Sequence, residues 1–124
     1  MALDDERPPV WVGHIVLRTP ELGGTRKFML QLGMRSIEHG DDFAVLELRG
    51  GTHLLLVPAE QDPSGPAPFD LMVDDLDIAH ARLRELGLDP SAIEASRFHR
   101  SFTIRSPSGH VITFNSSHVS DLPV

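Results

Sequence analysis

Residues 69–88 read FDLMVDDLDIAHARLRELGL and contain the clearest strand and helix signals of the chain. Their first five residues are strand-like, and Asp74-Asp75 then supplies a helix N-cap with negative charge at the positive end of the helix dipole. The helix that follows has one apolar stripe, formed by Leu76, Ala79, Leu83 and Leu86. Gly87 stands where a glycine commonly ends a helix, so the stretch predicts one strand followed by one helix.

A second copy of this pattern lies earlier in the chain. Residues 11–18 are rich in β-branched and apolar side chains and predict a strand, and residues 21–32 predict a helix. The triplets Leu32-Gly33-Met34 and Leu86-Gly87-Leu88 each close a helix and lie 54 residues apart. The chain therefore contains an internal repeat.

Three strand-like runs follow each predicted helix. They span residues 34–38, 43–48 and 52–57 in the first half, and 92–95, 99–105 and 110–115 in the second. Turn formers such as Ser106-Pro107-Ser108-Gly109 separate these runs. We predict an α+β fold in which two tandem βαβββ modules form a cup-shaped sheet within one domain. Module one spans about 11–58, a linker 59–67, module two about 68–116 and a tail 117–124.

The composition is that of an ordinary globular domain. Of 124 residues, 40% are hydrophobic and 23% charged, and the lack of Cys excludes disulfides, thiolate metal sites and a Cys nucleophile. The net charge of −7 disfavours a nucleic-acid partner, because a polyanion would be repelled. A secretory signal begins with positive charge followed by an apolar stretch, whereas the start of this sequence carries the acidic residues Asp4, Asp5 and Glu6. The apolar runs are too short to cross a bilayer. We expect a cytoplasmic protein with no membrane partner.

Alternation along the strands separates two faces of the predicted sheets. The apolar face, expected to pack on the helices, contains Ile15, Leu17, Leu54, Leu56, Phe69, Leu71, Phe102, Ile104, Ile112 and Phe114. The opposite face contains His14, Val16, Arg18, Val45, Glu47, His53, Leu55, Asp70, Met72, Ser101, Thr103, Arg105, Thr113 and Asn115. A curved sheet with a concave face of mixed polarity is typical of a small-molecule cup, although such a face could also be solvated or lie in a dimer interface.

Short motifs in a fixed order connect the chain to a known family. They are His14-Ile15-Val16-Leu17, Phe28-Met29, Leu32-Gly33-Met34, Val73-Asp74-Asp75-Leu76-Asp77, Leu86-Gly87 and Ser106-Pro107-Ser108-Gly109-His110-Val111-Ile112. In this order and spacing, roughly from Trp11 to Asn115, the chain resembles the glyoxalase/bleomycin-resistance/dioxygenase superfamily, also called the vicinal oxygen chelate (VOC) fold. The resemblance implies tandem βαβββ modules, a cup and, commonly, a homodimer.

The resemblance also implies where a metal would bind. In the metalloenzymes of the family, His, Glu or Gln side chains from the first and fourth strands of each module hold a divalent ion. His14 matches the first-strand position, but the repeat aligns it with Pro68, which has no donor side chain. The last-strand acid falls on Thr113, and its counterpart in module one falls on Leu55 or, with a register shift of two, on His53. One or two imidazoles would hold a divalent ion weakly.

Another branch of the family binds drugs such as bleomycin without metal or catalysis, and this branch matches the sequence better. We therefore predict a protein that binds a small molecule in its cup without a metal cofactor, with no catalytic residue assigned. The predicted ligand-binding residues are His14, Arg18, His53, Asp70, Thr103, Arg105 and Thr113. Arginines in this set suit a carboxylate, whereas Asp70 and Glu47 suit a cationic ligand, and the sequence does not decide between them.

Two alternatives remain open from the sequence. The first is a divalent-metal-dependent VOC enzyme, such as a lyase, isomerase or dioxygenase, in which His14 and His53 bind the ion together with Asp70 or Glu47. The second is a dimeric module that binds a partner protein and no ligand. Metal content separates the first alternative from the metal-free binding protein, and a cup filled by its own side chains would favour the second.

Overall fold

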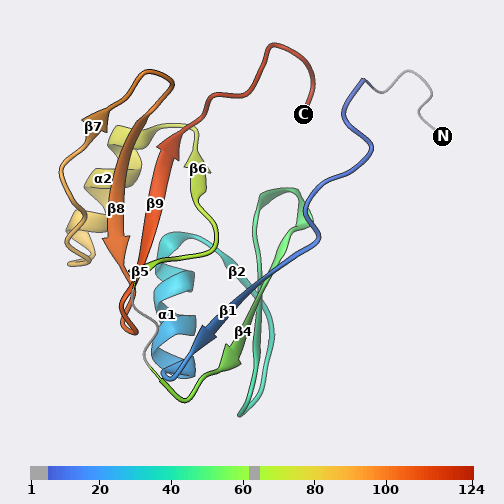
Figure 1. Cartoon of the computed structure of the whole chain (residues 1–124), viewed down its shortest axis with the longest axis vertical. Coiled ribbons are helices and arrows are strands. Elements are labelled where there is room, and N and C mark those ends of the chain that lie inside the picture. Colours follow the sequence, from blue (N-terminus) through green and yellow to red (C-terminus); the bar gives the residue numbers. More distant parts are fainter. Residues whose placement is uncertain (1–5, 62–64) are drawn as a thin grey trace.

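The computed structural model of the chain describes residues 6–61 and 65–124 (Figure 1). The first half contains β1 (His14–Thr19), α1 (Leu22–Leu32), β2 (Arg35–His39), β3 (Ala44–Glu47), the 3₁₀ turn η1 (Arg49–Gly51) and β4 (His53–Pro58). The second half contains β5 (Gly65–Pro66), β6 (Leu71–Val73), α2 (Leu76–Glu85), β7 (Glu94–Ala95), β8 (Arg100–Arg105) and β9 (His110–Ser116). Apart from the additional short strand β5, each half shows the predicted order of a strand, a helix and three strands.

The strands form two sheets, each with its own helix. Sheet A has the order β1-β4-β3-β2, with β1 and β4 parallel and the other neighbours antiparallel. In sheet B, β9 pairs with antiparallel β8, which pairs with β7, and with the parallel strands β5 and β6. Helix α1 packs on β3 and β4, and α2 packs on β8 and β9. In Figure 1, sheet B lies above sheet A.

One hydrophobic cluster joins both halves. Its buried members are Leu17, Phe28, Met29, Met34, Ala44, Leu46, Leu54, Leu56, Leu76, Leu83, Phe102, Ile104, Ile112 and Phe114. The strand residues among them belong to the faces that pack on the helices, because alternate side chains of a strand point to opposite sides. The predicted α+β fold class is therefore confirmed, and each sheet keeps a second face for other contacts.

The helix ends follow the local chemistry of the sequence. Asp75 caps α2, and its side chain accepts a hydrogen bond from the Ile78 backbone N–H at 3.0 Å. Gly33 follows α1 with a φ of 114°, a left-handed conformation in which glycine has no Cβ penalty. Within the described residues, no helix is long and apolar enough to cross a membrane.

The structure differs from the sequence prediction in the segment between the modules. This segment, expected as a linker over 59–67 with no strand assigned to it, contributes β5, which pairs with His110 and Val111 of β9. Pro66 can join the sheet because β5 is an edge strand, where a missing backbone N–H leaves no partner unsatisfied. Residues 62–64 of the predicted linker lie outside the described residues.

Candidate functional site

Four polar side chains form one row across sheet A, on the face opposite α1. Strand register pairs His14 with His53, His53 with Glu47, and Glu47 with Arg35. The row thus crosses β1, β4, β3 and β2 in order, and we call it the polar row. Directly opposite residues in neighbouring strands lie close enough for their side chains to interact. Register therefore places three of the sequence candidates, His14, His53 and Glu47, next to one another.

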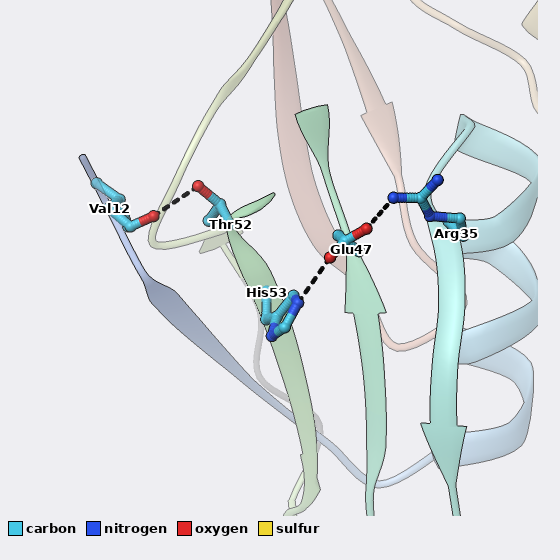
Figure 2. Close-up of polar contacts among 5 residues, drawn as sticks. All are labelled: Val12, Arg35, Glu47, Thr52 and His53. Atoms are coloured by element: carbon cyan, nitrogen blue, oxygen red, sulfur yellow. Dashed lines mark hydrogen bonds and ion pairs between the residues drawn. The ribbon is translucent and has the colours of Figure 1, made fainter. Parts of the chain in front are cut away.

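Glu47 lies between two hydrogen-bonding neighbours in this row (Figure 2). Its Oε1 accepts a hydrogen bond from Arg35 Nη2, and its Oε2 lies 2.9 Å from His53 Nε2. Arg35, and after it His53, holds the pKa of the Glu47 carboxyl below its ordinary value. An ionised carboxylate only accepts hydrogen bonds, so His53 Nε2 is the donor in this contact.

His14 completes the polar row at its other end. Its ring centroid lies 5.7 Å from that of His53, with the two planes at 62°. The side chain of His53 is 31% exposed and that of Glu47 18% exposed, so a ligand could reach the row from solvent. The Thr52 hydroxyl donates a hydrogen bond to the Val12 carbonyl at 2.6 Å and ties the start of β4 to the segment before β1 (Figure 2).

An apolar row lies beside the polar row on the same face. Val16 pairs with Leu55, and Leu55 pairs with Val45. Val16 is 45% exposed although it sits in the middle of a strand. The register places His53 rather than Leu55 beside His14. This face of sheet A therefore combines hydrogen-bonding groups with an exposed apolar surface, as small-molecule sites commonly do.

The corresponding face of sheet B carries other sequence candidates. Thr103 of β8 and Thr113 of β9 are directly opposite each other, and Arg105 is opposite Val111. A hollow of about 390 Å³ opens beside these strands. Its lining residues are Leu88, Asp89, Pro90, Ser91, Thr103, Ile104, Arg105 and Val111. Two of the predicted ligand-binding residues, Thr103 and Arg105, therefore line one hollow.

Asp70 and Arg18 lie apart from these groups. Asp70 precedes β6, and its Oδ2 accepts a hydrogen bond from Asn115 Nδ2 at 2.9 Å. Asn115 is buried, and its Oδ1 has no hydrogen-bond partner among the described residues. Arg18 is exposed near the end of β1. The carboxylate that contacts His53 is thus Glu47, and Asp70 belongs to the other half of the chain.

Sequence reasoning did not identify Arg35 or Asp89. Arg35 begins a fully exposed edge strand, and a surface arginine in such a strand has no special signal until register pairs it with Glu47. Asp89 lies in a loop after α2, outside any periodic segment. Its φ of 55° is a left-handed conformation that Asp tolerates better than most residues, but sequence does not reveal it.

Comparison with models of known protein families identifies the family of this chain. A model of the Glyoxalase/Bleomycin resistance protein/Dioxygenase superfamily matches residues 11–114. The chain belongs to this superfamily. The match covers both modules and agrees with the resemblance seen in the sequence motifs. A comparison with curated proteins found no match.

Solved structures of similar fold support the VOC assignment. A lactoylglutathione lyase from Agrobacterium tumefaciens is 17% identical, with a TM-score of 0.74 over 94% of this chain and 100% of that one. A superfamily protein from Alicyclobacillus acidocaldarius is 16% identical, with a TM-score of 0.69 over 93% and 96%. The fosfomycin resistance protein FosX from Listeria monocytogenes is 14% identical, with a TM-score of 0.70 over 87% and 93%. At these identities the likeness establishes the fold alone.

The side chains of this VOC protein can be tested against the metal set of the family. At the positions that the resemblance assigns to metal ligands, Pro68, Leu55 and Thr113 offer no carboxylate or imidazole. His14 and His53 are adjacent, but both oxygens of their neighbour Glu47 already interact with Arg35 and His53. Among residues 6–61 and 65–124, no group of three His, Cys, Asp or Glu is arranged to hold a metal ion. The donor set does not fit the chelate of the family.

Proposed function

We propose that this VOC protein binds a small organic molecule on the sheet faces opposite its helices and does so without a metal ion. The observation that carries the proposal is the engagement of Glu47 by Arg35 and His53. A carboxylate that already accepts hydrogen bonds from a guanidinium and an imidazole has partners with which a cation would have to compete. The polar row then serves as a set of hydrogen-bonding groups beside an apolar surface.

Metal content tests this proposal directly. Protein purified without chelators is expected to contain far less than one equivalent of Ni, Zn, Fe, Mn or Co by elemental analysis. Adding these ions should leave the melting temperature nearly unchanged, because a ligand that binds only the native state must raise it. His14→Ala and His53→Ala should change neither result. Stoichiometric metal that disappears in either variant would overturn the metal-free assignment.

A metal-dependent VOC enzyme is the second candidate function. It is favoured by one observation, the 5.7 Å separation of the His14 and His53 ring centroids with a carboxylate alongside. In that case a divalent ion would supply Lewis-acid chemistry to a substrate with adjacent oxygens. Glu47 would then orient the His53 ring through Nε2, since carboxylates commonly hold metal-binding histidines in this way. The metal measurement above separates the two candidates.

A further inference from the structure

One side of the hollow beside sheet B is a loop segment that is hydrogen-bonded to strand β8. The segment from α2 to β7 runs beside β8 (Figure 1). Within it, the Ser91 backbone N–H donates to the Thr103 carbonyl at 2.9 Å, and the Ser91 hydroxyl accepts from the Thr103 N–H at 2.8 Å. His80 of α2 lies within hydrogen-bonding distance of the Ser91 carbonyl, with 2.8 Å from Nε2 to the oxygen. Ligand pockets commonly range from about 300 to 1,000 Å³, and the hollow of about 390 Å³ falls in this range.

Two opposite charges line this hollow without neutralising each other. Arg105 and Asp89 both border it, and within the part of the chain that the structure describes neither makes an ion pair or a side-chain hydrogen bond. A guanidinium presents several donors in a planar fork that suits a carboxylate, whereas an ionised carboxylate suits a protonated amine. The Thr103 hydroxyl adds a neutral donor and acceptor beside the guanidinium.

Apart from Ser91, whose hydroxyl accepts from the Thr103 N–H, the remaining lining residues are apolar. They are Leu88, Pro90, Ile104 and Val111. Ile104 is a buried core residue whose side chain points to the face of β8 opposite Thr103 and Arg105, so the apolar surface open to a ligand comes from partly exposed residues such as Leu88 and Val111. Contact with an apolar ligand body would remove part of this surface from water, which is favourable. A ligand that satisfied all these groups would carry a carboxylate, an ammonium group and an aliphatic body.

We propose that this hollow binds a small zwitterion with an aliphatic body, with its carboxylate at Arg105 and its ammonium group at Asp89. The inference rests on the proposed function, because it names the class of ligand for the small-molecule site. A simple acid would be attracted by Arg105 and repelled by Asp89, and a simple amine would show the reverse. Only a zwitterion is favoured by both charges.

Three related probes test the charge requirement on the unaltered chain. L-Leucine carries both charges, 4-methylpentanoate lacks the amine, and 3-methylbutylamine lacks the carboxylate. Each is titrated into ¹⁵N-labelled protein near neutral pH at constant ionic strength, and amide shifts are followed in residues 88–91, 103–105 and 111. Leucine should give saturable shifts there, with a dissociation constant on the order of 1 mM. Each probe that lacks one charge should bind roughly 5-fold more weakly, the value of one exposed ion pair.

Two substitutions assign each charge to its partner. Arg105→Met keeps an unbranched side chain and should remove the preference for leucine over 3-methylbutylamine. Asp89→Asn keeps a residue that tolerates the left-handed backbone and should remove the preference for leucine over 4-methylpentanoate. Arg84→Met and Asp121→Asn alter exposed charges outside the hollow and should leave both preferences unchanged.

The outcomes separate this inference from the proposed function. Equal binding of the three probes, or the absence of saturable leucine shifts at the named residues, would overturn the zwitterion site and leave the metal-free assignment intact. Stoichiometric metal bound through His14 or His53 would overturn the metal-free assignment and leave the leucine result standing. The comparison of probes needs no variant, so a substitution that failed to fold would not weaken the test.

Discussion

Glu47 contributes to stability through its ionised form. Arg35 and His53 stabilise the carboxylate in the folded chain and lower its pKa, whereas the unfolded chain has neither partner in place. A carboxyl with a lowered folded pKa adds stability above its unfolded pKa, and this stability is lost as the pH falls through the folded pKa. The polar row is therefore expected to weaken in acid.

Glu47→Gln should isolate this contribution. The amide keeps the size of the side chain but cannot carry the charge, so the variant should be less stable than the unaltered chain near neutral pH. The difference should shrink between neutral pH and a pH below the lowered folded pKa of Glu47, where the unaltered carboxyl becomes protonated. Urea unfolding at both pH values measures it, with Glu38→Gln as an exposed control on the neighbouring strand. A difference independent of pH would contradict the role of the charge.

We expect His110 to make the stability of the protein depend on pH as well, in a higher pH range than Glu47 does. Its ring is buried, with Nδ1 3.2 Å from the Ser108 hydroxyl, and burial lowers its pKa because the charged form loses water. The unfolded chain therefore takes up a proton first, and stability should fall as the pH drops below about 6.5 towards the lower folded pKa. In His110→Gln, the urea concentration at the midpoint of unfolding should change less between about pH 7 and pH 5 than in the unaltered chain. An unchanged slope would show that His110 is not responsible.

At the level of elements, the N-cap of α2 should make a measurable contribution to the free energy of unfolding. Asp75 accepts a hydrogen bond from the Ile78 N–H, one of the donors that have no partner inside the helix. Asp75→Ala should lower the free energy of unfolding by about 1 kcal/mol, the usual cost of losing such a cap. Asp41→Ala, in an exposed turn, should change it much less. Chemical unfolding of both variants under the same conditions compares them, and equal losses would contradict the cap.

At the level of the whole molecule, the exposed apolar row of sheet A leads us to expect a homodimer. Val16 and Met72 are about half exposed on the faces opposite the helices, and a symmetric partner would cover such surface and the strand edges. Light scattering after size exclusion should give twice the chain mass of 13.7 kDa at micromolar concentration. A monomeric mass would contradict the expectation.

A pair of substitutions locates the surface that associates. Val16→Asp places a charge on the apolar row and should shift the protein towards the monomer, because burying an unpaired charge is costly. Ile78→Asp is the matched control, since Ile78 is 67% exposed on α2, away from that face. It should leave the mass unchanged. If both variants remain dimeric, the apolar row does not form the interface.

The sequence by itself determined the two helices, the main strands and the faces of those strands, with the short strand β5 as the exception. The signals used were local: helix caps such as Asp75, the closing Gly33 and the alternation of apolar residues. Each acts over a few neighbouring positions, so it can be recognised from the sequence alone. From these local signals followed the two βαβββ modules, the helix-facing core and the superfamily. The resemblance also identified which expected metal positions lack a donor, since that requires only residue identities.

Only the tertiary structure decided which side chains meet. Alternation placed His14, His53 and Glu47 on one face, but their contact depends on the register of separate strands, which turns and the irregular pairing near Ser36 determine. The same holds for Arg35, whose partner comes from another strand. Asp89 reaches the hollow of Arg105 because a loop packs along β8. Such contacts join residues far apart in the chain, and no local pattern encodes their distance.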